Sequence, residues 1–70
     1  MAGMIRVMKM ERLQGGQMGL TFDVRTSAGQ FPFDLKISDQ GSMAANEKQA
    51  LQELEKVFRE ALDLVQHQLV

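Results

Sequence analysis

Residues 18–38 form two runs in which apolar and polar side chains alternate, and this pattern constrains the fold more than any other feature. The apolar residues are Met18, Leu20, Phe22 and Val24 in the first run, and Phe31, Phe33, Leu35 and Ile37 in the second. Successive side chains of a β-strand point to opposite faces of its sheet. The two runs therefore predict a hairpin with one apolar face and one charged face, and the apolar face needs a second layer to cover it.

The turn between these two strands sets their register, and two loops are compatible with the pattern. The apolar faces match only if opposed residues have numbers with an odd sum. A two-residue loop at Ala28-Gly29 meets this condition and pairs Val24 with Phe33. A four-residue loop, Ala28 to Phe31, also meets it and improves the cross-strand charge pairing. We favour the shorter loop because it keeps Phe31 in the core.

Residues 4–13 are predicted to form another strand, although their alternation is imperfect. The pair Gly15-Gly16 follows them, and it suits a two-residue hairpin turn because both positions tolerate positive φ. This turn pairs Val7 with Val24 and places Ile5 and Val7 on the apolar face. The predicted strands are then residues 4–13, 18–26 and 31–38.

The methionines of the first strand are its least expected feature. In the register of the Gly-Gly turn, Met4, Met8 and Met10 lie on the outer face of the sheet, whereas a bulge near Lys9 would return Met10 to the apolar face. Methionine is over-used at adaptable binding surfaces. Because no other segment of the chain is left to cover the outer face, we interpret these methionines as candidate interface residues.

A long helix is predicted for residues 43–69, with its N-cap at Ser42 or, alternatively, at Asn46. At 1.5 Å per residue, the part from Asn46 onward is ~36 Å long, against ~27 Å for an eight-residue strand, so we expect the helix to outrun the sheet. Its main apolar stripe contains Leu51, Leu54, Phe58, Ala61, Leu62, Val65 and Leu69. A flanking line at seven-residue spacing contains Ala50, Val57 and Leu64.

These elements predict an α+β fold of order β-β-β-α. We expect a three-stranded antiparallel meander with one long C-terminal helix packed across its apolar face. Phe22, Phe33 and Phe58 should form the centre of the core. Pro32 cannot donate a ladder hydrogen bond, which predicts that its strand lies at an edge of the sheet.

The length and composition limit how this fold gains stability. Seventy residues allow one domain, 1–70, with a small core. Cysteine is absent, so disulfides and thiolate-bound metals are excluded, and oligomerisation is the remaining common source of stability. Eight basic against nine acidic residues give a net charge of −1, which neither requires nor excludes a polyanionic partner.

The sequence is typical of a cytoplasmic protein. It contains no apolar run near the ~20 residues that a membrane span requires. Arg6 and Lys9 interrupt residues 1–10, which therefore lack the apolar centre of a signal peptide. A second methionine, Met4, is a candidate natural start of the chain, with residues 1–3 as an added tag.

The β-β-β-α order and the helical sequence from Glu47 to Leu54 resemble the half-size double-stranded-RNA-binding-like fold of HicB-type antitoxins. The likeness is architectural and covers most of the chain. The acidic-Pro-Gly-Cys turn that usually precedes the helix in that family is absent, because residues 38–41 read Ser-Asp-Gln-Gly. The resemblance transfers no residue roles, and by analogy it points to a small bacterial or prophage protein.

No motif in the sequence supports catalysis or cofactor binding. His67 is the only histidine, and its helical position places it on the charged face without a nucleophile or orienting carboxylate. Asp23 and Asp34 alternate with basic residues, which is typical of a solvated charge ladder. The Gly15-Gly16 pair lacks the strand–loop–helix context of a phosphate cradle. We expect a protein that is not an enzyme and has no metal or cofactor.

Two functions are compatible with the sequence. The first is that of a protein-interaction module that forms a homodimer or docks on a larger protein partner. Its expected interface residues are Met4, Met8, Met10, Ala50, Val57 and Leu64. The alternative is a small dimeric regulator that binds nucleic acid through Arg6, Arg12 and Arg25 on the outer face. That face lacks an aromatic side chain for base stacking, and we therefore favour protein binding.

Overall fold

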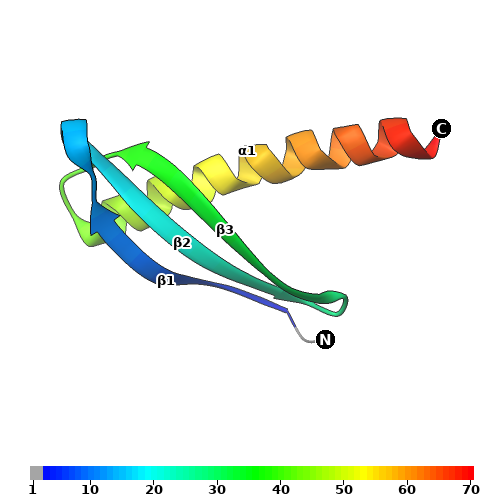
Figure 1. The fold of residues 1–70 in the computed structure, drawn as a ribbon, viewed down its shortest axis with the longest axis horizontal. Helices are drawn as coiled ribbons and strands as arrows, with labels where there is room; N and C mark the ends of the chain where they lie inside the picture. Colours follow the sequence, from blue (N-terminus) through cyan, green and yellow to red (C-terminus); the bar gives the residue numbers. More distant parts are fainter. Residues whose placement is uncertain (1–2) are drawn as a thin grey trace.

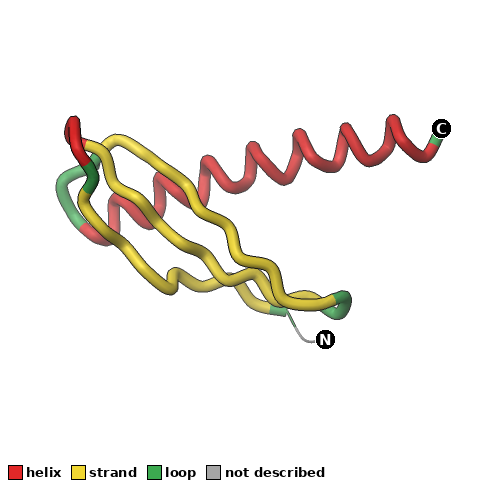
Figure 2. Tube along the Cα trace, in the orientation of Figure 1, coloured by secondary structure: helices red, strands yellow, loops and turns green. Residues whose placement is uncertain are grey.

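The computed structural model describes residues 3–70 and contains three strands and one helix. The strands β1 (Met4–Arg12), β2 (Gln17–Thr26) and β3 (Gly29–Ser38) form an antiparallel sheet of order β1-β2-β3. The helix α1 (Met43–Leu69) crosses one face of this sheet (Figures 1 and 2). The predicted β-β-β-α fold is confirmed, and so is the edge position of the strand that contains Pro32. The interpretation of Met4 as the natural start concerns residues 1 and 2, which lie outside the described residues.

The β2–β3 register differs from both predicted loops, although the predicted parity is correct. The loop is Ser27-Ala28, and Val24 pairs with Phe31. The side-chain oxygen of Thr26 accepts a hydrogen bond from the backbone N–H of Ala28 at 3.1 Å, which closes the turn before Gly29. The favoured register would have left Phe31 without an apolar partner. The observed one pairs every apolar residue of β3 with one of β2: Met18 with Ile37, Leu20 with Leu35, Phe22 with Phe33, and Val24 with Phe31.

The β1–β2 connection is a three-residue turn, η1 (Gln14–Gly16), rather than the predicted two-residue loop. Gly15 and Gly16 both have positive φ, as their sequence predicts, at 73° and 72°. The backbone N–H of Leu13 donates to the carbonyl of Gln17 at 2.8 Å and closes the turn. The extra residue of the turn moves the register by one, and an irregularity between Val7 and Lys9 moves it by one more. The predicted Val7–Val24 pairing is therefore wrong, and Val7 pairs with Phe22.

A β-bulge between Val7 and Lys9 reconciles the imperfect alternation of β1. On the C-terminal side of the bulge, Met10 pairs with Leu20 and lies against the core. On the N-terminal side, Ile5 pairs with Val24, so it also lies on the apolar face. The bulge alternative is therefore confirmed, and the placement of Met10 on the outer face is wrong.

The core lies between the sheet and the first half of α1. Its buried apolar residues are Met18, Leu20, Phe22, Val24, Ile37, Ala50 and Leu54. The helix packs mainly against β3 and also against β2. Phe33 and Phe58, both partly buried, pack against this cluster from its side. The prediction that Phe22, Phe33 and Phe58 form the centre of the core is confirmed for Phe22 only. The largest fully buried side chains are Phe22, Leu20 and Leu54, and Phe33 and Phe58 pack against the cluster that contains them.

The helix docks through Asn46, Ala50 and Leu54, which are buried at four-residue spacing. Ala50 has no exposed surface, so its predicted place at an intermolecular interface is wrong. The reason is that the face of the helix that contains Ala50 is the face that packs against the sheet. Leu51, predicted to face the sheet, is 40% exposed as a consequence.

The N-terminus of α1 begins at Ser42, whose hydroxyl accepts a hydrogen bond from the backbone N–H of Ala45. Asn46 is not the cap but a buried anchor for the preceding loop. Its amide oxygen accepts from the Gln40 backbone N–H at 2.6 Å, and its amide nitrogen donates to the Asp39 carboxylate at 3.2 Å. These bonds hold the loop between β3 and α1 against the helix.

Candidate interaction surface

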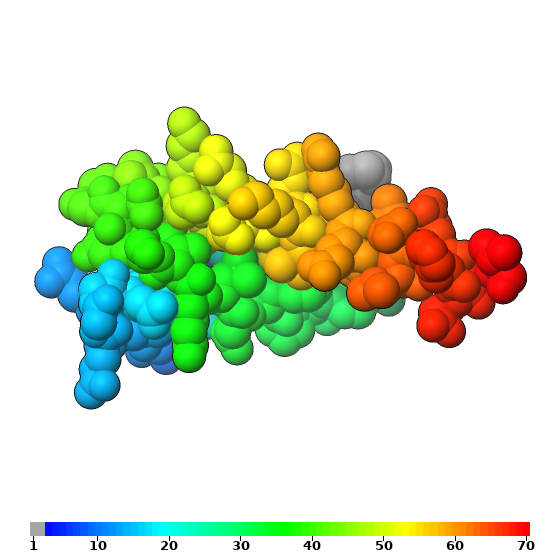
Figure 3. Space-filling model, turned by 90° about the horizontal axis from the view of Figure 1, so that it is seen from above, coloured from blue at the N-terminus to red at the C-terminus, as the bar shows by residue number. Residues whose placement is uncertain are grey.

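The C-terminal part of α1, residues 59–69, extends beyond the sheet and is exposed at every position; we call it the overhang. It diverges from the strands in Figure 1, and its red end projects beyond the rest of the molecule in Figure 3. The expectation that the helix outruns the sheet is confirmed. Leu62, Val65 and Leu69 of the overhang are 58%, 52% and 80% exposed, although the sequence pattern assigned all three to the buried stripe.

An apolar groove of about 310 Å³ lies beside the docked part of the helix. It exists because α1 covers β3 and β2, which leaves the apolar face of β1 open at Ile5. The groove is lined by Ile5, Leu51, Leu54, Phe58 and Leu62, with Glu55 and Arg59 at its rim. Leu62 belongs to both the groove and the overhang, so the two form one continuous apolar surface.

The exposed and partly buried apolar residues along this side of α1 follow the spacing of a helix–helix contact. Leu51, Phe58 and Val65 are seven residues apart, and so are Leu62 and Leu69. We call these five residues the helix seam. Seven-residue repeats of this kind bring apolar side chains to one line where another helix can pack. The helix seam was not recognised as a surface from the sequence because the same residues read equally well as the sheet-facing stripe.

Val57 and Leu64, the other helix residues predicted at an interface, are also exposed, at 38% and 62%. The helix seam lies on one side of the line along α1 that faces the sheet, and Val57 and Leu64 lie on the other side. Without the buried Ala50, this flanking line contains only these two residues. It is therefore a smaller apolar surface than the helix seam and its groove.

The outer face of the sheet is organised around a buried carboxylate. Asp23 is 4% exposed, and its Oδ2 atom lies 3.1 Å from Nε of Arg25 and 3.7 Å from Nε of Arg6. The predicted register opposed Arg6 and Arg25. In the structure Arg6 instead pairs directly with Asp23 across the strands. The two guanidinium groups compensate the desolvated charge of Asp23. Both arginines therefore have a structural role, because they compensate the charge of Asp23 in the sheet.

Arg12 does not share the outer face with these arginines. It pairs with Met18 and so lies on the helix side of the sheet, since directly paired residues share a face. Its charge acts there on Asp39. Hydrogen bonds from the Gly41 backbone and the Asn46 side chain, with a smaller contribution from Arg12, lower the pKa of Asp39. The predicted three-arginine patch is therefore divided between two faces.

Two of the three methionines predicted at the interface are exposed. Met4 pairs with Arg25 on the outer face and is 47% exposed, and Met8 lies at the bulge and is 54% exposed. Met10 packs against the core instead. The exposed methionines of β1 are therefore Met4 on the outer face and Met8 at the bulge.

Within the described part of the chain, the candidate catalytic side chains His67, Asp23 and Asp34 do not contact one another. His67 is exposed, and its Nδ1 lies 2.9 Å from the Asp63 carbonyl of its own helix. Asp34 accepts from the Thr21 hydroxyl at 2.7 Å, and Asp23 is held by arginines, so the two carboxylates do not form a pair. Among residues 3–70, no three potential metal ligands cluster. No helix within that range has the length and hydropathy to span a membrane.

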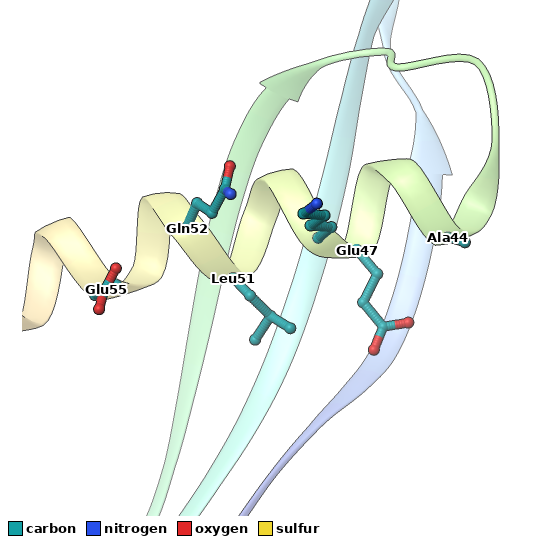
Figure 4. A pocket seen from close by; sticks show the side chains of 6 residues that line it. Ala44, Glu47, Leu51, Gln52 and Glu55 are labelled. Atoms are coloured by element: carbon teal, nitrogen blue, oxygen red, sulfur yellow. The ribbon is translucent and has the colours of Figure 1, made fainter.

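The hollow in Figure 4 lies along the first half of α1 and has a volume of about 530 Å³. All of its lining residues come from this one helix: Ala44, Glu47, Lys48, Leu51, Gln52 and Glu55. Leu51 and Glu47 point to the same side of the helix. Glu47 and Glu55 are two turns apart, about 12 Å along the axis, so they cannot act as an acid–base pair on one substrate. The hollow extends the exposed surface around Leu51.

Comparisons with known protein families, with characterised proteins and with solved structures gave no match. They give no support to the resemblance to HicB-type antitoxins, which stays a prediction from the sequence.

Proposed function

We propose that this protein is a non-enzymatic interaction module that forms a homodimer through α1 and docks on a larger protein partner. The observation that carries the proposal is the overhang, whose apolar side chains Leu62, Val65 and Leu69 are more than half exposed. An isolated helical segment of this length is marginal in water without tertiary contacts. Exposed apolar patches of this kind mark association surfaces.

The size of the domain supports the same proposal. Among residues 3–70, only seven apolar residues are buried in the core, and the chain has no cysteine to form a disulfide. Small domains in this position commonly gain stability by oligomerisation. A dimer that buries the overhang would supply apolar burial that the single chain lacks.

The outer face of the sheet is the proposed site for the larger partner. Met4 is exposed there and Met8 is exposed at the bulge of β1, and the side chains of Arg6 and Arg25 are about half exposed. Methionine side chains adapt to irregular partner surfaces, which suits this role. A photoreactive side chain at Met8 should cross-link one protein in the native lysate, whereas the same group at Glu60 should not. Equal labelling from both positions would contradict this assignment.

Binding of nucleic acid is the less supported alternative. Arg6 and Arg25 contact the buried Asp23, and Arg12 lies on the other face of the sheet. The three phenylalanines of the sheet pair with residues of its apolar face, and Phe58 packs against the core. Stacking of bases on the outer face therefore has no aromatic platform among residues 3–70.

Analytical sedimentation at micromolar concentration tests the dimer. The parent should sediment at twice the chain mass of 7.9 kDa. Leu62→Glu/Val65→Glu should sediment as a monomer, because two carboxylates would have to be buried in the contact. Lys56→Glu/His67→Glu is the matched control, since it adds two carboxylates on the polar face of the same helix and should stay dimeric. A monomeric parent would contradict the proposal.

A further inference from the structure

We infer that the groove beside α1 is filled by the overhang of a second copy, which lies antiparallel along the helix seam and covers the partner's Ile5. This inference rests on the proposed homodimer and specifies how its two chains meet. Each protomer then supplies both the groove and the helix that fills the other groove. Such an arrangement is isologous, the self-complementary contact of a two-fold dimer.

The single chain exposes more surface than a compact protein of its mass, and this excess is similar to the area that each chain of a dimer would bury. Its accessible surface is 5528 Å². A compact monomer of this mass exposes about 4,400 Å², and a standard interface buries about 800 Å² per partner. The radius of gyration is 13.7 Å, against about 11 Å for a compact domain of this length. The excess surface of the single chain is thus of the order of one protomer's share of an interface.

When two copies run antiparallel about residue 60, four of the five residues of the helix seam oppose one another. Leu51 then faces Leu69 of the other copy, and Phe58 faces its Leu62. Ala61 lies next to the two-fold axis, where its small side chain permits close approach of the helices. The fifth residue, Val65, faces Glu55 in the groove of the other copy.

The rim of the groove is compatible with an apolar occupant. Glu55 and Arg59 line it and form an ion pair with each other at 3.2 Å. The rim therefore presents a neutralised pair to an approaching helix. Filling the groove would also cover the apolar face of β1, which α1 of the same chain leaves open at Ile5.

Spin-label distances test the antiparallel register. The chain has no cysteine, so single cysteines at Lys48, Glu60 and His67 can each be labelled selectively. With the axis at residue 60, the axial separation between equivalent labels is close to zero at 60. It rises to about 21 Å at 67 and about 36 Å at 48, from the 1.5 Å rise per residue. Similar short distances at all three positions would mean a parallel dimer and would overturn the inference.

A second experiment tests whether Ile5 is covered by the partner. Ile5→Ala should weaken the dimer about tenfold, because it removes apolar area from both copies of the contact. Met4→Ala is the matched control: its side chain is as exposed as that of Ile5 but lies on the opposite face of β1, so its dissociation constant should stay unchanged.

The outcomes separate this inference from the proposed function. An unchanged dissociation constant for Ile5→Ala, with a Val57→Glu/Leu64→Glu variant that is monomeric, would place the contact on the other flank of α1. That result would overturn the antiparallel groove arrangement and leave the homodimer standing. A parent chain that is monomeric at micromolar concentration would overturn both.

Discussion

Phe33 of β3 and Phe58 of α1 meet edge to face, with ring centroids 5.2 Å apart and ring planes at 75°. This contact marks the end of the helix–sheet interface, because every residue of α1 after Phe58 is exposed. The pair divides the helix into a half that belongs to the core and a half that is free to contact another chain.

Removal of the Phe58 ring should destabilise the fold strongly. Phe58→Ala deletes the edge-to-face contact and opens a cavity against the core. We expect it to lower the free energy of unfolding by about 3 kcal/mol. This value is at the lower end of the range for such substitutions because the ring is partly exposed. Urea unfolding by circular dichroism measures this. Phe58→Leu is the control and should cost less than half as much. A midpoint within error of the parent for Phe58→Ala would mean that the helix is not docked through this ring.

The buried carboxylate of Asp23 should contribute more to stability than other carboxylates of the sheet. Asp23→Asn leaves Arg6 and Arg25 without their shared anion, and we expect a loss of about 1–3 kcal/mol. Asp34→Asn is the matched control on the neighbouring strand, where the side chain accepts only from Thr21 and is exposed. Its loss should stay below about 1 kcal/mol. Equal losses for the two variants would contradict the structural role of Asp23.

Asp39 should make the stability depend on acidic pH. Its pKa in the folded chain is lowered from 3.8, chiefly by the hydrogen bond from the Gly41 backbone and then by that from Asn46. The ionised form is therefore favoured by folding, so its stabilisation is present above the unfolded pKa and is lost as the pH falls through the folded pKa. Urea midpoints measured from about pH 6 down to about pH 2 should fall more for the parent than for Asp39→Asn. Parallel curves would show that Asp39 does not contribute.

Nucleic acid should not bind with the affinity of a regulator. Because two of the three candidate arginines contact Asp23 and the third lies on the helix side, few phosphate contacts are available. We expect no retention on double-stranded DNA or RNA columns at about 50 mM or about 200 mM salt. Retention at the lower concentration that falls about tenfold or more at the higher one would favour the regulator instead.

The alternation of residues 18–38 was enough to predict the strands and the apolar face, but not the register. A shift of two residues keeps every side chain on its face, so periodicity cannot distinguish Val24–Phe31 from Val24–Phe33. The Thr26 side chain, which closes the turn at Ala28, was the local signal that would have selected the observed loop.

The direction in which α1 docks could not be predicted because its apolar sector is wider than the surface it buries. Ala50 and Leu51 are adjacent in sequence, and either could have faced the sheet on hydropathy alone. The small side chain of Ala50 allows close approach of the helix to the strands, which leaves Leu51 at the groove. The burial of Asp23 was also missed, because its two arginine contacts depend on the register of β1 after the bulge.

Hydrogen exchange at two protein concentrations tests the central claim most directly. In a dimer built on the helix, amides of residues 59–69 should exchange slowly at high micromolar concentration and become fast on dilution below the dissociation constant, since no segment of the same chain covers them among the described residues. Amides around Ala50 and Leu54 should stay protected better on dilution, because those side chains are buried against the sheet. Fast exchange of residues 59–69 at both concentrations would contradict the account, and so would equally slow exchange at both.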